Sequence, residues 1–186
     1  MTETIAVKMQ PLTAEAFRPY GHIVDEKHPA YPDVEEGRPA VLAVHLKHNL
    51  TAKRVGQLAI HFSYGQTFTP LQGSMVLIVA PPPRNREASH DAYELDYERL
   101  AAFVMEPGDT VYIDKGVWHI PATLGGNCRF LTSTRLDPPK TGARQVAEPE
   151  GPITIEQVIA RQKQQTSFIE YVDLQKRDNR IIELEL

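Results

Sequence analysis

The segment that decides the fold reads Pro107-Gly108-Asp109-Thr110-Val111-Tyr112-Ile113-Asp114-Lys115-Gly116-Val117-Trp118-His119-Ile120-Pro121. Its apolar residues predict two short strands, and Gly116 supplies a tight turn between them. His119 follows shortly after that turn. Such a unit can place a histidine at the mouth of a small β-barrel, where the imidazole could bind a metal, transfer a proton or hold a carboxylate. A buried Trp118 and a hydrogen-bonded His119 in an ordinary hairpin would give the same pattern.

Short apolar segments separated by turn residues make up most of the chain. The 186 residues include 15 prolines and 11 glycines, which favours many strands over long helices. Residues 57–64 alternate, so His61 is predicted on the face opposite Leu58 and Ile60. Residues 74–80 form a continuous apolar run that should be buried on both faces. The spacing predicts a β-sandwich or a small barrel, with further strands over residues 22–24, 40–46, 110–114 and 128–134 and an ambiguous segment over residues 93–105.

Two helices and a last pair of strands are also predicted. Thr13 is expected to cap a short N-terminal helix. Residues 154–157 have the form of a capping box at the start of a helix that ends near Gln165. Segments 168–174 and 180–186 are predicted as strands that the polar residues between them could join into a hairpin.

The composition changes after residue 139 and divides the chain into two parts. Residues 1–139 are interpreted as a β-barrel domain. Residues 140–186 are interpreted as a C-terminal extension that begins with a linker over residues 140–152. No catalytic cluster is visible in the extension. It is therefore expected to pack on the barrel or on a partner subunit.

Composition and charge exclude several classes of function. The chain is 41% hydrophobic and 24% charged, as in ordinary globular proteins. A formal net charge of −4 without a basic stripe argues against nucleic-acid binding. The longest apolar stretch, Met75 to Ala80, is too short to span a bilayer, and the first residues carry no export signal. The single Cys128 excludes an intrachain disulfide and fits a reducing compartment, so a cytoplasmic protein is expected.

Three polar residues, His61, Gln66 and His119, are the candidates for chemistry. Neutral imidazoles suit divalent transition metals, and the amide oxygen of Gln66 could add a weaker ligand. Without a carboxylate, a tight structural zinc site is not expected. Two alternatives remain: one divalent metal in an open site, or a metal-free pocket in which His119 is a general acid or base. His45 and His48 have a spacing that suits metal binding on a helix, whereas their segment is predicted as strand and turn.

Three passages resemble one family of proteins. The spacing Gly108-Asp109-x4-Asp114-x-Gly116-x2-His119 resembles the second motif of the cupins. Within the cupins, residues 11–21 (Pro-Leu-Thr-Ala-Glu-Ala-Phe-Arg-Pro-Tyr-Gly) are similar to the N-terminal signature of the ureidoglycolate lyase family. Residues 61–71 and 116–121 resemble its central His…Gln-Ala-Phe-x-Pro-Leu segment and its Val-Trp-His-His-Pro motif. The chain, from about residue 9 to 136, is thus identified as a divergent member of this family.

The resemblance implies both a fold and an activity. It implies a cupin-type β-barrel or jelly roll, dominated by strands and often dimeric, here followed by the C-terminal helix and strands. It implies cleavage of a small carboxylate substrate, ureidoglycolate, into glyoxylate and urea during allantoin breakdown. His119 and His61 would be the catalytic acid–base residues, and Gln66, Trp118 and Tyr112 would bind the substrate. A divalent metal would be held by His61, Gln66 and His119, although metal-free operation fits the same residues.

Two departures from the family pattern affect the site. Ile120 replaces the second histidine of the Val-Trp-His-His-Pro motif, and Ala59 stands where the central segment commonly has glutamate. The leading hypothesis is a lyase that acts on ureidoglycolate or a related hydroxy acid. The alternatives are a metal-dependent cupin of another activity, such as an isomerase or oxygenase, and a non-catalytic cupin that binds a small carboxylate.

Overall fold

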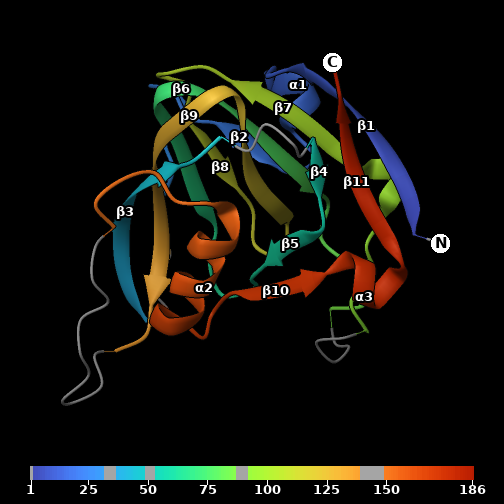
Figure 1. Ribbon diagram of the computed structural model, residues 1–186. Helices are drawn as coiled ribbons and strands as arrows, with labels where there is room; N and C mark the ends of the chain where they lie inside the picture. Colours follow the sequence, from blue (N-terminus) through green and yellow to red (C-terminus); the bar gives the residue numbers. More distant parts are fainter. Residues whose placement is uncertain (1, 32–36, 49–52, 87–91, 139–148) are drawn as a thin grey trace.

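Strands dominate the computed structural model, which describes residues 2–31, 37–48, 53–86, 92–138 and 149–186 (Figure 1). The strands form one large mixed sheet. They are β1 (Glu3–Pro11), β2 (Gly21–Ile23), β3 (Arg38–Leu46), β4 (Arg54–Val55), β5 (Gln57–Ile60), β6 (Gln66–Ala80), β7 (Ala101–Met105), β8 (Val111–Ile113), β9 (Trp118–Leu136), β10 (Glu170–Asp173) and β11 (Arg180–Glu185). The helices are α1 (Ala14–Phe17), α2 (Ile155–Gln165), α3 (Leu174–Asp178) and the 3-10 helix η2 (Tyr97–Arg99).

The two longest strands, β6 and β9, pair antiparallel and connect the two halves of the sheet. Their register shifts around Gly73, which has a positive φ of 74° and no room for a Cβ atom against the Asn127 carbonyl. On one side of this irregularity β8 pairs with β6 and β3 pairs with β9; on the other side the partners are β7 and β5. The sheet thereby encloses a core, and the predicted cupin-type β-barrel is confirmed.

Two hydrophobic cores lie on opposite faces of the β6–β9 pair. The inner core is enclosed by the barrel and takes Met75, Leu77 and Val79 from β6. The outer core takes Val76, Ile78 and Ala80 from the same strand. Residues 75–80 are fully buried, so the predicted burial on both faces is confirmed. The outer core is covered by β1 and by the C-terminal extension, which contribute Val7, Ile159, Val172, Leu174, Ile182 and Leu184.

The C-terminal extension packs on the barrel of its own chain. Strand β10 pairs with β5, and β11 pairs parallel with β1 and antiparallel with β4. The predicted hairpin is wrong, because α3 separates β10 from β11 and each strand finds its partner in the barrel domain. Helix α2 has the predicted capping box at Thr154 and lies across the barrel between β3 and β10 (Figure 1). Most of the predicted linker lies outside the described residues.

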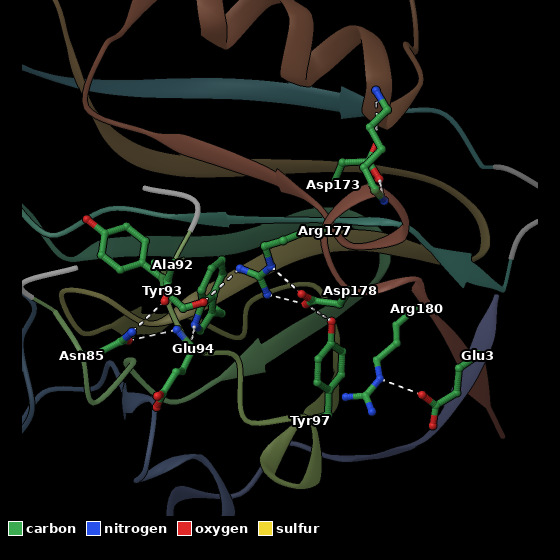
Figure 2. Close-up of polar contacts among 12 residues, drawn as sticks. Glu3, Asn85, Ala92, Tyr93, Glu94, Tyr97, Asp173, Arg177, Asp178 and Arg180 are labelled. Carbon is green, nitrogen blue, oxygen red and sulfur yellow. Dashed lines mark hydrogen bonds and ion pairs between the residues drawn. The ribbon is translucent and has the colours of Figure 1, made fainter. Parts of the chain in front are cut away.

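A polar cluster fastens the extension to the barrel (Figure 2). Arg177 forms an ion pair with Asp178 at 2.5 Å, and its guanidinium lies 5.4 Å from the centre of the Trp118 ring. The Tyr97 hydroxyl donates to the same Asp178 carboxylate at 2.5 Å. Arg180 of β11 pairs with Glu3 of β1 at 2.8 Å. The contacts with Trp118, Tyr97 and Glu3 join α3 and β11 to segments 59, 81 and 177 residues earlier in the chain.

The opening sequence segment folds differently from the predicted hairpin. Strands β8 and β9 do not pair with each other, because both pair with β6. The N-terminal helix forms as predicted, with the Thr13 hydroxyl accepting from the Ala16 N–H group at 3.2 Å. Strand β1 was not anticipated. Among the described residues, none of the helices is both long and apolar enough to cross a membrane.

Candidate active site

His61, Gln66 and His119 converge inside the barrel, as the sequence predicts. Their side chains are 1%, 2% and 3% exposed. His61 follows the end of β5, Gln66 begins β6, and His119 is the second residue of β9. The turn after β8 brings the segments together, because the Gly116 N–H group donates to the His61 carbonyl at 2.7 Å. The His61 and His119 rings meet edge to face, with their centres 4.9 Å apart.

His61 is held by contacts on both ring nitrogens. Its Nδ1 lies 2.7 Å from the Tyr64 carbonyl, and its Nε2 lies 2.9 Å from Gln66 Oε1. The Tyr64 ring stacks on the imidazole at 3.9 Å. Gln66 in turn contacts the Thr132 hydroxyl at 2.7 Å. The imidazole therefore has one fixed orientation within a buried polar network.

The protonation of His61 is coupled to the orientation of the Gln66 amide. Both ring nitrogens face acceptor oxygens, which only a cationic imidazole can satisfy. Burial lowers the pKa of His61 to about 4, although the hydrogen bonds to Gln66 and Tyr64 raise it. At neutral pH the ring is therefore neutral. A half-turn of the Gln66 amide then places its nitrogen toward Nε2 and its oxygen toward Thr132, which satisfies the neutral ring.

His119 presents an unprotonated nitrogen to the cavity. Its Nδ1 donates to the Val117 carbonyl at 2.9 Å, which fixes the tautomer with the lone pair on Nε2. Among the described residues, the hydrogen bond made by this ring is on Nδ1 and none is made by Nε2, and His119 lines the cavity described below. Burial is the main cause that lowers the pKa of His119 to about 3, and the neighbouring His61 adds to this effect. A neutral imidazole with a free Nε2 can accept a proton, but a pKa of about 3 makes it a weak base in the closed cavity. General-base catalysis by His119 therefore requires contacts with substrate or water that stabilise the imidazolium.

A cavity of about 20 Å³ lies beside these residues. It is lined by side chains from the inner barrel wall and from the C-terminal extension. The barrel contributes Gln66, His119 and Thr132, and the extension contributes Gln162 and Tyr171. This volume holds about one water molecule.

The donor set does not fit a divalent metal. Sites that bind a divalent metal through neutral protein ligands alone use three imidazoles, whereas this site offers two imidazoles and one weaker amide oxygen. Among the described residues, no group of three or more histidine, cysteine, aspartate or glutamate side chains could hold an ion. The three predicted ligands, His61, Gln66 and His119, are all neutral. His45 and His48, which the sequence did not favour as a metal pair, also lack a third ligand among the described residues, and His48 Nδ1 is 2.8 Å from the Thr123 hydroxyl.

Two of the predicted substrate-binding residues lie away from the cavity. Trp118 is fully buried in the outer core, because consecutive residues of β9 point to opposite faces. Its Nε1 donates to the Glu94 carbonyl at 3.3 Å. Tyr112 lies between the inward-facing Val111 and Ile113 on β8 and contacts the His22 ring at 5.3 Å. The structure therefore does not support a substrate-binding role for Trp118 or Tyr112.

The two departures from the family pattern occupy different environments. Ala59 lies directly opposite His119 in the β5–β9 pairing and lines the same cavity. A carboxylate at position 59 would therefore stand beside the proposed base. Ile120 packs in the outer core and forms part of the wall behind the cavity. The missing glutamate thus alters the inner site, whereas the missing second histidine alters its outer wall.

Several cavity residues were not predicted. Tyr64 and Thr132 join the network through His61 and Gln66. The alternation of β9 could have indicated Thr132, because it lies on the face that carries Phe130. Gln162 and Tyr171 come from the extension and are joined by a hydrogen bond from the tyrosine hydroxyl to the amide oxygen. No local sequence signal connects these two residues to a site built from residues 61–132.

Comparisons with known proteins identify one family and several proteins to which this chain is similar. A family model described as ureidoglycolate lyase matches residues 36–156. A protein of Agrobacterium fabrum provisionally named a ureidoglycolate lyase is 34% identical over 122 residues, which cover 61% of this chain and 72% of that protein. A ureidoglycolate lyase of Pseudomonas syringae pv. syringae is 28% identical over 68% of this chain and 81% of that protein. A dTDP sugar isomerase structure from Desulfovibrio desulfuricans is 16% identical with a TM-score of 0.37, covering 73% of this chain and 80% of that one.

Proposed function

The chain belongs to the ureidoglycolate lyase family, and we propose that it splits ureidoglycolate into glyoxylate and urea. The observation that carries the proposal is the free Nε2 of His119, which faces a cavity also lined by the amides of Gln66 and Gln162. A hydroxy acid with a ureido group offers a hydroxyl proton to a base and an amide-like group to these side chains. The alternatives of an isomerase, an oxygenase or a binding protein have no comparable support.

The reaction needs a base and an acid but consumes no water. The base removes the proton from the carbinol hydroxyl, and the electrons of that O–H bond form the carbonyl of glyoxylate. The C–N bond breaks, and its electrons go to the urea nitrogen, which takes up one proton. One proton is thus lost and one gained, so a single imidazole can carry it between the two positions.

His119 is suited to accept that proton. Its tautomer places the lone pair on Nε2, within the cavity. The imidazolium that forms lies next to a neutral His61, so no like charge opposes it as long as His61 keeps its pKa of about 4. The proton can then return from His119 to the urea nitrogen. Gln66 lines the cavity and is positioned to orient the substrate by hydrogen bonds, whereas His61 does not line the cavity and acts by holding the Gln66 amide.

We propose that this reaction proceeds without a metal. The support is the chemistry of the donor set, in which two neutral imidazoles and one amide supply no negative charge. In contrast, a general base requires the free Nε2 of His119 and no negative ligand. Extensive chelation followed by metal analysis is expected to leave the activity unchanged. Loss of activity on chelation, with recovery on addition of one metal, would contradict the metal-free route.

The activity itself is tested by direct product analysis. Purified protein is incubated with ureidoglycolate while glyoxylate and urea are quantified, and both are expected in equal amounts. A His45→Ala variant serves as the control for loss of a histidine in general, because it removes a partly exposed histidine outside the cavity, and it should release the same products. Absence of glyoxylate from folded wild-type protein, with and without added divalent metals, would rule out the proposed function.

We further propose that the protein acts in allantoin breakdown in the cytoplasm and as a homodimer. The pathway follows from the proposed substrate. The cytoplasmic location is supported by the single cysteine, Cys128, which is buried and unpaired. Light scattering coupled to size-exclusion chromatography tests the assembly, and a monomeric mass at micromolar concentration would contradict the dimer.

A further inference from the structure

The cavity beside His119 is too small for the proposed substrate. Its volume of about 20 Å³ suits one water molecule. Ureidoglycolate carries a carboxylate, a hydroxyl and a ureido group on one carbon, so it is several times larger than water. For cleavage to occur next to His119, part of the cavity wall has to move.

Helix α2 is attached to the barrel by backbone hydrogen bonds only at its two ends, where Ile153 bridges to β3 and the Gln165 carbonyl accepts from the Asp137 N–H group. It spans the opening between β3 and β5, two strands that both pair with β9 and leave a gap between them. It closes that gap with the apolar side chains of Val158 and Ile159, which are 8% and 5% exposed. The other walls consist of strands held in the sheet by backbone hydrogen bonds. Moving the middle of α2 outward would break side-chain contacts and at most the single backbone hydrogen bond at Gln165, whereas displacing a strand would break the sheet.

A larger cleft lies on the other side of α2. This outer cleft has a volume of about 500 Å³ and is lined by parts of β4, β9, α2 and β11. Its size falls in the range of small-molecule binding sites. The outer cleft and the inner cavity share four lining residues, Ile120, Pro121, Ile155 and Ile159. The wall between the two spaces is therefore one layer of side chains thick, and α2 supplies half of it.

One hydrogen bond connects α2 to the floor of the cavity. The Tyr171 hydroxyl of β10 donates to the Gln162 amide oxygen of α2, and both residues line the inner cavity. The amide of Gln162 has a donor and an acceptor side, as does a ureido group. A ureido group in the cavity can pair with the Gln162 amide, and its carbonyl oxygen can accept from the Tyr171 hydroxyl that Gln162 releases, so no buried polar atom is left unpaired.

We propose that α2 is a movable wall that opens the inner cavity toward the outer cleft, and that Gln162 binds the ureido group of the substrate that enters. This inference rests on the proposed lyase function. It assigns the C-terminal extension a direct role in substrate admission and recognition, although the family match ends at residue 156. Gln162 and Tyr171 both lie beyond that match.

Locking α2 to the barrel tests the opening. Val44 of β3 and Val158 of α2 line the same two cavities and belong to one hydrophobic cluster, so a Val44→Cys/Val158→Cys variant places one thiol on the barrel and one on α2 around the same space. Oxidation, or a short bismaleimide if no disulfide forms, fixes α2 closed. Cleavage of ureidoglycolate is expected to fall at least tenfold in the disulfide form and to recover on reduction. Each single-cysteine variant, treated in the same way, controls for oxidative damage. A fully cross-linked protein that keeps its activity would overturn the movable wall.

A second readout does not depend on catalysis. Diethyl pyrocarbonate modifies unprotonated imidazoles that it can reach, and mass spectrometry locates the product. His119 is expected to react in the reduced variant and to be protected after cross-linking, while the exposed His28 reacts equally in both forms. Equal reaction of His119 in both forms would contradict opening of α2. Protection without glyoxylate production in either form would retain the movable wall and reject the lyase function.

The role of Gln162 is tested by removing its amide. A Gln162→Leu variant is expected to raise the KM for ureidoglycolate about tenfold with a smaller change in kcat. Gln164→Leu is the matched control, because Gln164 is an exposed glutamine on the same helix. A Gln162→Glu variant, which keeps the shape but loses the donor side, should show an intermediate KM. A KM that stays unchanged in Gln162→Leu would reject the recognition role.

Discussion

The inner and outer faces of strand β9 have opposite chemistry. On the inner face, His119 and Thr132 join Gln66 and His61 in a buried network of polar side chains. On the outer face, Trp118 and Ile120 pack in an apolar core that the C-terminal extension covers. Neighbouring residues of β9 therefore have different roles. The inward-facing residues supply polar groups to the site, and the outward-facing residues pack against the C-terminal extension. A conspicuous sequence motif such as Trp-His can belong half to the site and half to the core.

The largest effect is expected on the inner face. His119→Ala removes the proposed base, so kcat/KM for ureidoglycolate should fall by about 10²- to 10⁴-fold. The free energy of unfolding should fall by less than the activation free energy rises. The reason is that the His119 side chain contributes one hydrogen bond to the fold, to the Val117 carbonyl. Steady-state kinetics and urea denaturation measure the two quantities. A variant with near-normal kcat/KM would remove His119 from the mechanism.

The outer face should respond in the opposite way. Trp118→Ala creates a void in the outer core and removes the ring beneath Arg177, so the free energy of unfolding should fall by about 3–5 kcal/mol. Activity per folded molecule should change little at a temperature where the variant remains folded. Thermal and urea denaturation, combined with kinetics, check both statements. A stable but inactive Trp118→Ala protein would place Trp118 in the site after all.

Lowering the pH should reduce the free energy of unfolding, because His61 and His119 are buried as neutral rings on the inner side of the barrel. Folding lowers the pKa values of His61 and His119 from 6.5 to about 4 and about 3. The unfolded chain therefore binds more protons than the native state below pH 6.5, and stability is lost as the pH falls from that value toward 4. Between pH 7 and pH 5 these two residues should account for about 2–4 kcal/mol of unfolding free energy. A His61→Gln/His119→Gln variant should show a shallower pH dependence, and an unchanged slope would contradict their burial as neutral rings.

Restoring the family's residues at positions 59 and 120 should affect the inner and outer faces of β9 differently. Ala59→Glu places a carboxylate opposite His119, so the pKa of His119 and the acid limb of the kcat/KM profile should rise by about 1–2 pH units. Ile120→His places its imidazole in the outer wall, and the acid limb should stay where it is. The pH dependence of kcat/KM, measured for both variants, tests these two expectations. An equal shift in Ile120→His would mean that position 120 communicates with the base.

The smallest effect is expected at the polar cluster outside the barrel. Tyr97→Phe removes the hydroxyl that donates to Asp178 and leaves the Arg177–Asp178 pair intact. The loss should be about 1 kcal/mol in unfolding free energy with no change in kinetics. A larger loss would show that the attachment of the extension, rather than the outer core, limits stability.

The inner site was predictable from local patterns. Alternation in residues 57–64 placed His61 opposite Leu58 and Ile60, and the structure puts those two residues in the outer core. The same alternation across Trp118-His119 argues against Trp118 as a substrate contact, because adjacent residues of a strand cannot share a face. The capping box at residues 154–157 predicted the start of α2 correctly.

The contribution of the C-terminal extension to the cavity wall was not predictable from the sequence. Gln162 and Tyr171 meet across a turn between α2 and β10, and they reach His119 only because β10 pairs with β5. Pairing between strands distant in sequence leaves no local trace. Strand β1 was missed for a related reason, since its partners β7 and β11 lie about a hundred or more residues later in the chain.

The pairing of β1 with β11 also sets an order of events in time. Arg180 and Glu3, joined by an ion pair, are 177 residues apart. During synthesis β1 leaves the ribosome early, and its β11 partner is translated only after the barrel strands. Until then one edge of β1 has open N–H and C=O groups, which can recruit other nascent chains. Completion of this fold is therefore a late event, and a translation pause or truncation ahead of β11 should leave a barrel that aggregates through its first strand.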